Sequence, residues 1–277
     1  MTASFAREWD TTKGRWRDVG VMLEAGMRVH LRLLGLMTIR AGTVLVRGSE
    51  FPGRQGRLAL AYLAIQRRPV TRDELAGVVW CGAPPDGWER NLAALVSKLR
   101  ALLVRVGLTD PDVLATGQGG YELRLPRWVE VDVHAAAGHL EHAEVAMRAG
   151  RPDEALPAAE TAANLARQPL LPGEEALWLD HARAVLRLTL VHALEISTDV
   201  LHARGDLHNA LRRAEEAVLL EPFRESGHVR LMRVHLDAGN RAEGLRAYER
   251  CRRLLAGELG VDPSAETQAA YHLLLGG

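Results

Sequence analysis

The spacing of apolar residues between positions 89 and 106 predicts an amphipathic helix. Leu92, Val96, Leu99 and Leu103 fall within roughly 60° of one another when each residue turns the helix by about 100°. The opposite face combines cations, short hydrogen-bonding groups and a small residue: Arg90, Asn91, Ala94, Ser97, Lys98 and Arg100. In the major groove of DNA, Arg and Lys read guanine and short side chains allow close approach. The pattern predicts either a DNA-recognition helix or a solvated amphipathic helix, and the neighbouring elements decide between the two.

Before this helix, the pattern predicts short strands followed by two helices. Apolar residues alternate over residues 28–40 with an interruption at Gly35, and a further strand is expected over 43–47. Helical spacing predicts a helix over 54–67 that ends before Pro69. This part of the chain is therefore expected to combine a small sheet with helices.

A second helix and a hairpin complete this part of the chain. Thr71 and Glu74 form a capping-box pattern that begins the second helix, and residues 113–125 have the alternation of a hairpin. Three glycines supply its turn: Gly117, Gly119 and Gly120. A phosphate-binding glycine loop would need a helix after it, whereas the alternation here predicts a strand. Strands, three helices and a hairpin, in this order, are typical of a winged helix-turn-helix. Its third helix enters the major groove, and its hairpin lies along the backbone or minor groove.

The second half of the chain has helical spacing and an internal repeat. The segment 205–211 recurs as 239–245, 34 residues later, which is the period of tetratricopeptide repeats. A fainter copy begins at Gly150. Small residues at matching positions allow paired helices to pack closely, and stacked pairs bury the surface that a single pair leaves exposed. This half is expected to be an all-α stack of helical hairpins.

These patterns divide the chain into three parts. Residues 1–27 lack a sustained period and are expected to form a loosely attached tail or a short helix, with Met27 as an alternative natural start. Residues 28–126 are the predicted winged helix-turn-helix domain, and residues 127–277 are the predicted tetratricopeptide-like helical repeat domain. The expected fold class is mainly α with a small β component.

The charges are unevenly distributed, although the formal net charge is zero. Residues 28–125 carry 14 Lys and Arg against 8 Asp and Glu, whereas residues 126–277 carry 17 against 23. A basic part followed by an acidic part fits a module that binds a polyanion, joined to one that stays off the polyanion.

The cysteine content and hydropathy indicate where the protein resides. Cys81 and Cys251 are too few for a disulfide framework or a metal knuckle. We expect Cys81 to be exposed in a loop and Cys251 to lie in a core. No apolar run reaches the roughly 18 residues that span a bilayer, and residues 1–26 lack the layout of a secretion signal. The expected location is the cytoplasm, without a membrane partner.

Motifs of enzymes and cofactor sites are not found in the sequence. It contains neither a P-loop nor a Gly-x-Ser-x-Gly elbow. His139 and His142 lie near Glu141 and Glu144, but no further Cys or His lies at ligand spacing, so a polar helix surface is the preferred interpretation. We expect no catalytic residues, no metal and no cofactor.

Short segments in a fixed order resemble the Streptomyces antibiotic regulatory protein (SARP) family of transcriptional activators, over roughly residues 28–275. In the first half they are Leu33-Leu34-Gly35, residues 54–60, residues 75–80, Pro84-Pro85, Asn91, Ser97-Lys98-Leu99-Arg100 and Gly120-Tyr121. In the second half they are Val131-Asp132, residues 171–174, Trp178, Glu221-Pro222, Ala247-Tyr248 and residues 258–264. Their order over some 230 residues makes the resemblance specific.

The resemblance implies an OmpR-type winged helix joined to a bacterial transcriptional activation domain of tetratricopeptide-like hairpins. It also implies a sequence-specific activator that binds direct repeats at promoters of secondary-metabolite (antibiotic) gene clusters and recruits RNA polymerase through its sigma factor and other subunits. Self-association on DNA would follow from the direct repeats. By position, the base-facing residues would be Arg90, Ala94, Ser97 and Lys98, and the phosphate-binding residues Arg54, Arg57, Asn91 and Arg100.

The sequence departs from the family pattern at the hairpin and leaves a second function open. Gly117 stands where an arginine is common before the hairpin tip, which puts minor-groove reading by the hairpin in doubt. The predicted recognition helix has few polar groups, so we expect Arg90 and Lys98, together with DNA shape, to determine which bases are recognised. The alternative function is a helical-repeat scaffold for protein interactions, or a small-molecule sensor, with weak DNA binding.

Overall fold

The computed structural model describes residues 6–10, 15–19, 28–117 and 119–276. The chain separates into two compact units. The first contains the chain up to His134 together with Pro169–Arg183, and the second contains Ala135–Gln168 and Ala184–Gly277. The return of residues 169–183 to the first unit is a feature that the sequence patterns did not indicate.

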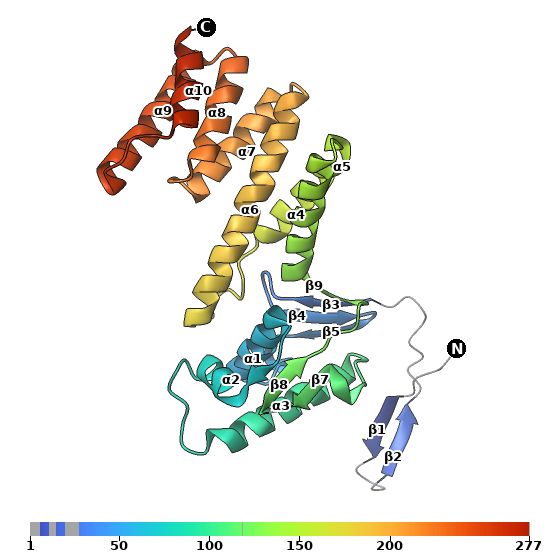
Figure 1. Cartoon of the computed structure of the whole chain (residues 1–277). Helices are drawn as coiled ribbons and strands as arrows, with labels where there is room; N and C mark the ends of the chain where they lie inside the picture. The colour runs from blue at the N-terminus through green and yellow to red at the C-terminus, as the bar shows by residue number, and fades with distance from the viewer. Residues whose placement is uncertain (1–5, 11–14, 20–27, 118, 277) are drawn as a thin grey trace. The chain divides into compact units, whose positions relative to one another are not determined.

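A four-stranded sheet forms one part of the first unit (Figure 1). Its strands, in the order β5-β4-β3-β9, are β3 (Val29–Arg32), β4 (Thr38–Ala41), β5 (Val44–Arg47) and β9 (Val129–Val131). β9 runs parallel to β3, and the other pairs are antiparallel. Alternate residues Val29, Leu31, Ile39 and Val46 are buried, which confirms the period-two pattern read from the sequence.

Three helices follow the sheet and pack on one another (Figure 1). They are α1 (Gly53–Gln66), α2 (Arg72–Val79) and α3 (Trp88–Arg105), and short 3-10 turns cover Gly48–Glu50 and Pro111–Val113. The Thr71 side chain accepts a hydrogen bond from the Glu74 backbone N–H, so the predicted cap of the second helix is confirmed. The first and third helices lie within one residue of their predicted bounds, 54–67 and 89–106.

A small three-stranded sheet carries the hairpin, or wing. Its strands, in the order β6-β8-β7, are β6 (Val70–Thr71), β7 (Leu114–Gly117) and β8 (Gly120–Leu123). The backbone of Gly120 passes so close to β6 that a Cβ atom there would lie 2.1 Å from the Val70 carbonyl oxygen. Only glycine fits at this crossing, and the arrangement is the predicted winged helix-turn-helix.

Residues 1–27, expected to form a tail or a short helix, instead contain two strands. β1 (Ala6–Asp10) pairs antiparallel with β2 (Arg15–Val19), with Trp9 opposite Trp16. Each strand has only two apolar residues, and these lie three positions apart, so no period-two alternation stands out in the sequence. Met27 lies outside the described residues.

The second unit is helical, as predicted (Figure 1). Its elements are α4 (Asp132–Arg148), α5 (Pro152–Ala166), α6 (Leu177–Ala203), α7 (Leu207–Leu220), α8 (Glu225–Asp237), α9 (Arg241–Leu254), the π-helical turn Leu255–Leu259 and α10 (Ala265–Gly276). The first residues of α4 and α6 belong to the first unit. Among the described residues, no helix has both the length and the apolar character needed to cross a membrane.

The predicted repeat is visible in the backbone and in the core. Gly150, Gly205 and Gly239 each follow a helix with a positive φ of 67°, 75° and 73°, which favours glycine. Five residues after each glycine lies a buried small residue, and a second lies twelve residues after: Ala155, Ala210 and Gly244, then Ala162, Ala217 and Cys251. The expectation that Cys251 packs in a core is therefore confirmed. Gly150 precedes Gly205 by 55 residues instead of 34, and the longer spacing contains the segment 169–183.

Candidate nucleic-acid interface

The inner face of α3 holds this helix against the first unit. Leu92, Val96, Leu99 and Leu103, the stripe predicted from the sequence, are all at most 3% exposed. Leu95 and Leu102, which the predicted stripe omitted, are buried as well. Burial of a leucine side chain contributes about 1.5–3 kcal/mol, so this stripe fixes which face of the helix points outward.

The outer face of α3 is accessible. Arg90, Asn91, Ala94, Ser97 and Lys98 are all exposed. Within the described part of the chain, neither Arg90 nor Lys98 forms an ion pair with an acidic side chain. Two free cations, with small side chains between them, can approach base edges and phosphates without first breaking an internal contact.

Arg100 is turned toward the wing. Its guanidinium Nε and Nη2 donate to the Leu114 carbonyl oxygen at 3.0 and 2.8 Å, and Nη2 also donates to Thr116 Oγ1 at 2.7 Å. The side chain is half-buried. Arg100, expected from the resemblance to hold a phosphate, ties α3 to β7 in this structure and holds the wing against α3.

A shallow hollow lies beside the C-terminal half of α3. It measures about 340 Å³ and is lined by Glu50, Phe51, Pro52, Lys98, Ala101, Leu102 and Arg105. Arg105 forms an ion pair with Glu50, so Lys98 is the cation of this lining that has no described acidic partner. The hollow extends the accessible surface of α3 toward the start of α1.

Arg54 and Arg57, at the first turns of α1, hold a carboxylate. Arg54 Nε lies 2.9 Å from Glu174 Oε2, and Arg57 Nη2 and Nε lie 2.6 and 3.0 Å from Glu174 Oε1. The Glu174 side chain is 8% exposed. The resemblance implies that both arginines bind phosphate, and in this structure the same guanidinium groups bind an acidic side chain of residues 169–183.

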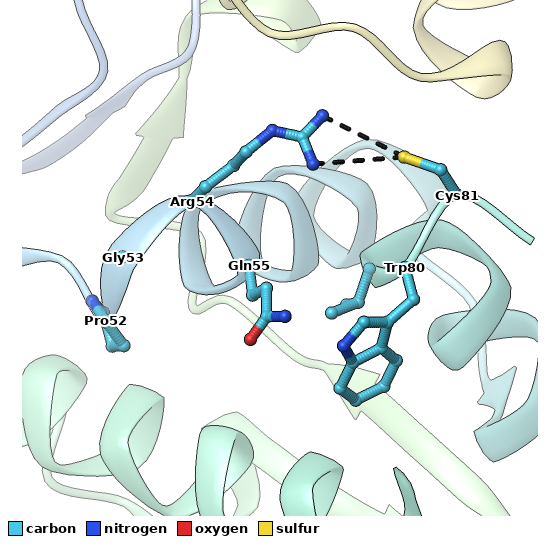
Figure 2. Close-up of a pocket in the computed structure, with 7 residues that line it drawn as sticks. Pro52, Gly53, Arg54, Gln55, Trp80 and Cys81 are labelled. Carbon is cyan, nitrogen blue, oxygen red and sulfur yellow. Dashed lines mark hydrogen bonds between the residues drawn. The ribbon is translucent and has the colours of Figure 1, made fainter. Parts of the chain in front are cut away.

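Arg54 also borders a hollow on the outer side of α1 and α2 (Figure 2). This hollow of about 430 Å³ is lined by Pro52, Gly53, Arg54, Gln55, Val79, Trp80 and Cys81. The Arg54 guanidinium points at the Cys81 sulfur, with Nη1 and Nη2 at 4.0 and 3.9 Å, and Nη2 donates to the Glu175 carbonyl oxygen at 2.7 Å. Cys81 is exposed, as the sequence predicted.

A polar cluster joins α1 to α2. The Tyr62 hydroxyl donates to Glu74 Oε1 at 2.5 Å, and Arg68 binds both carboxylate oxygens of Glu74. Burial raises the pKa of Tyr62 to about 12, and the neighbouring Glu74 carboxylate adds to this effect, so the hydroxyl remains a donor. The ring of Tyr62 packs edge-on against Trp178 at 5.1 Å. These contacts fix the angle between the two helices that precede α3.

Asp132 fastens the start of α4 to the sheet, a role that sequence reasoning missed. Its carboxylate accepts backbone N–H groups of Leu33 at 2.9 and 3.0 Å, Leu34 at 2.9 Å and Val133 at 2.9 Å. Burial raises the pKa of Asp132, and the backbone donors oppose this shift. The Val131-Asp132 pair was visible in the sequence, but its partner lies about a hundred residues earlier and leaves no local signal.

Among the described residues, no three His, Cys, Asp or Glu side chains gather into a metal site. His139 and His142 are exposed on α4. The wing contributes Thr116 and the exposed Gly117 and Gly119, and Gln118 lies outside the described residues. The candidate site of this chain is the surface formed by α3 with the wing and the start of α1.

Comparisons with known proteins agree with this geometry. Residues 131–275 match the family model of the bacterial transcriptional activator domain. The regulatory protein AfsR of Streptomyces coelicolor is 30% identical over 236 residues, which cover 85% of this chain and 23% of AfsR. The transcriptional regulatory protein MoaR1 of Mycobacterium tuberculosis is 27% identical over 237 residues, which cover 83% of this chain and 75% of MoaR1.

A solved structure is also similar over both units. Mycobacterium tuberculosis EmbR in complex with a low-affinity phosphopeptide gives a TM-score of 0.80 at 26% identity, covering 90% of this chain and 65% of EmbR. The chain thus spans under a quarter of AfsR and about two thirds of the EmbR structure. The likeness extends to the winged helix and to the tetratricopeptide-like helices.

Proposed function

Because the chain belongs to the family of regulators that carry the bacterial transcriptional activator domain, the SARP family, we propose that it binds promoter DNA through α3 and activates transcription there. As a member of this family it is a transcriptional regulator and not an enzyme. The promoter class we propose is that of secondary-metabolite gene clusters, with direct repeats as binding sites.

The observation that carries the proposal is the outer face of α3. Arg90 and Lys98 are exposed and have no described acidic partner, and Ala94 and Ser97 between them are exposed and small. A cation can make a bidentate contact with guanine O6 and N7, and each good contact discriminates by about 1–3 kcal/mol. Asn91, on the edge of the same face, is placed to bind a phosphate.

The start of α1 supplies a second, flanking contact in this proposal. Arg54 and Arg57 lie in the first turns of a 14-residue helix, where the helix dipole favours an anion. Their guanidinium groups already hold a carboxylate in charge-assisted hydrogen bonds, and a phosphate suits the same donor geometry. We therefore keep both arginines as phosphate contacts of the DNA complex.

Recruitment of RNA polymerase is the second part of the proposal. The loop between α2 and α3 is exposed throughout residues 81–87, and two prolines, Pro84 and Pro85, restrict its backbone. A rigid, accessible loop beside the recognition helix can contact a partner already bound next to the promoter. We propose that this loop contacts the sigma factor or another polymerase subunit, and that copies of the chain assemble head to tail on direct repeats.

The experiment is a binding titration with promoter DNA taken from the genomic neighbourhood of the coding sequence. Arg90→Ala and Lys98→Ala are each expected to weaken binding to the cognate site by about 1–3 kcal/mol. Arg246→Ala removes an exposed charge from α9 in the second unit and serves as the matched control. If both α3 variants bind as tightly as the control, the proposed recognition helix is wrong.

The alternative function places the binding site on the repeats. A hollow of about 350 Å³ there is lined by Thr198, Asp199, His202, Ala203, Arg230, Arg233 and Asp237. Its charged groups mainly pair with one another, because Arg230 binds Asp199 and His202 binds Asp237. Thermal stabilisation by a metabolite or peptide, with no shift of promoter DNA in a gel, would favour this alternative.

A further inference from the structure

We propose that Glu174 is an internal competitor for DNA phosphate at the start of α1. While its carboxylate is bound, Arg54 and Arg57 are withheld from DNA, and DNA binding at α1 requires the loop 172–176 to release them. This inference rests on the proposed function, because it concerns the regulation of the same surface.

The Nε and Nη2 edge of each arginine is occupied. Arg57 directs both Nε and Nη2 at Glu174 Oε1, and Arg54 directs Nε at Glu174 Oε2 and Nη2 at the Glu175 carbonyl oxygen. A phosphate that binds through the same pair of parallel N–H groups has to displace these oxygens. Carboxylate and phosphate therefore exclude each other at this edge of each guanidinium.

The base of the loop is firmly held. Leu170 pairs with Leu34 in an isolated bridge, and the Leu171 N–H donates to the Leu33 carbonyl oxygen at 3.0 Å. The Arg183 guanidinium donates to the carbonyl oxygens of Leu170, Leu171 and Glu174, the last at 2.8 Å. These contacts keep Glu174 close to α1 whether or not its side chain is bound.

Movement can be confined to the tip of the loop. Leu171 has a φ of 43° and Gly173 a φ of 80°, and a non-glycine residue in this region stores backbone strain. Pro172, Gly173 and Glu175 are exposed. A local rotation about Leu171 to Gly173 would carry the Glu174 carboxylate into solvent. It would break the bond from Arg183 to the Glu174 carbonyl oxygen and leave the contacts of Leu170 with Leu34 and of the Leu171 N–H with Leu33 intact.

The competition has a measurable signature in the salt dependence of DNA binding. Each phosphate contact releases about 0.9 counterion, so contacts from Arg54 and Arg57 add about one to two to the slope of log affinity against log salt. A closed loop also lowers the apparent affinity by the fraction of molecules in the open state. The bound complexes of the unmodified chain and of a variant without the carboxylate make the same phosphate contacts, so removing the carboxylate should raise the affinity, whereas removing the two arginines should lower the slope.

The experiment uses the full chain, promoter DNA and the variant Glu174→Gln. We expect DNA binding of this variant to tighten about three- to tenfold, whereas Arg54→Ala with Arg57→Ala should lower the slope by about one to two. In a background of Arg54→Ala with Arg57→Ala, the same Gln substitution should have no effect on affinity. Glu216→Gln is the matched control, because it removes a carboxylate bound to Arg167 within the second unit.

Three results would overturn the proposal. An affinity of Glu174→Gln equal to that of Glu216→Gln would show an ion pair with only a structural role. Weaker DNA binding by Glu174→Gln, together with a lowered melting temperature, would also show that the ion pair has only a structural role. An effect of Glu174→Gln that persists without the two arginines would place its cause elsewhere.

Hydrogen exchange of the unmodified chain gives a test that needs no variant. The Glu174 N–H donates to the Leu171 carbonyl oxygen at 3.2 Å, and saturating DNA should accelerate exchange in residues 173–176. Unchanged or slower exchange in those residues would contradict the proposal. Lys98→Ala separates the two hypotheses: if it abolishes DNA binding while Glu174→Gln has no effect, the competition fails and the recognition helix stands.

Discussion

Two cationic surfaces of the first unit differ in how available their charges are. On α3, Arg90 and Lys98 are exposed and have no acidic partner among the described residues. On α1, Arg54 and Arg57 are bound to the buried carboxylate of Glu174. Positively charged side chains that are predicted to contact DNA are thus exposed on α3 and bound to a carboxylate on α1. The comparison shows that local sequence determines which charges a surface carries, whereas the tertiary contacts determine which of them are free.

The largest expected effect is a loss of folding stability when the close crossing of β6 and β8 in the first unit is disrupted. Gly120→Ala would place a Cβ atom 2.1 Å from the Val70 carbonyl oxygen, so β6 and β8 must separate. We expect a loss of about 3 kcal/mol or more of folding stability, the range of severe backbone and packing disruptions. Gly117→Ala is the control, because nothing lies within 4 Å of a Cβ at that position. Equal urea midpoints for the two variants would contradict the described crossing.

The next effect separates the two surfaces directly. Arg90→Ala with Lys98→Ala should weaken binding to the cognate promoter by about 1–3 kcal/mol for each residue. Arg54→Ala with Arg57→Ala should change binding much less, because Glu174 occupies both arginines in the free protein. The arginine pair should instead lower folding stability by about 1–3 kcal/mol, since Glu174 is left buried without its partners. Paired titrations and denaturation curves measure both quantities, and the reverse order of effects on affinity would contradict the comparison.

A smaller effect is expected at Arg100, which supports the α3 surface from the side. Arg100→Ala removes the hydrogen bonds to the Leu114 carbonyl and to Thr116. We expect a loss of about 1–2 kcal/mol of folding stability. Thr116→Val keeps the bond to the Leu114 carbonyl, so its effect should be smaller than that of Arg100→Ala. A variant at Arg100 that keeps full stability but loses DNA affinity would identify a phosphate contact in place of a structural one.

The smallest expected effect is a dependence on pH that is specific to the second unit. His228 and His235 are buried, and burial lowers the pKa of both. In His228, Nε2 lies 2.9 Å from the Pro222 carbonyl oxygen, and Nδ1 has no hydrogen-bond partner among the residues that the structure describes. Protonation would place a charged N–H in a buried position without an acceptor.

The sign of this dependence follows from the lowered pKa values. The unfolded chain takes up protons near pH 6.5, where the folded chain does not, so the stabilising contribution is complete above that pH and is lost as the pH falls below it. Denaturation curves should show that the folding stability of the unmodified chain falls between pH 7.5 and pH 5.5. This fall should be smaller in the double variant His228→Gln with His235→Gln. An equal fall in the variant would assign the dependence to other groups.

The elements that the sequence predicted well are those with a local, repeated signal. The buried stripe of α3, the cap at Thr71 and the glycines of the repeats all follow from residue spacing within one or two turns. The small residues five and twelve positions after each repeat glycine are buried for the same reason. Helix and turn preferences act over such short distances, so a single sequence reveals them.

The parts that could not be predicted depend on contacts between distant residues. Arg57 and Glu174 are 117 residues apart, and Leu33 and Asp132 are 99 apart. The resemblance alone assigned Arg54 and Arg57 to phosphate, and no local pattern indicated that Glu174 binds them. The strand pair β1 and β2 was missed for a different reason, since both segments are mostly charged and their apolar residues do not alternate.

The most direct test of the account is the affinity of the Arg90→Ala, Lys98→Ala double variant for its promoter, measured beside a shuffled DNA sequence of equal length and composition. The account predicts that the unmodified chain prefers the promoter and that the variant loses most of that preference while it keeps its melting temperature. A variant that stays folded and still prefers the promoter as strongly as the unmodified chain would show that α3 does not read the DNA.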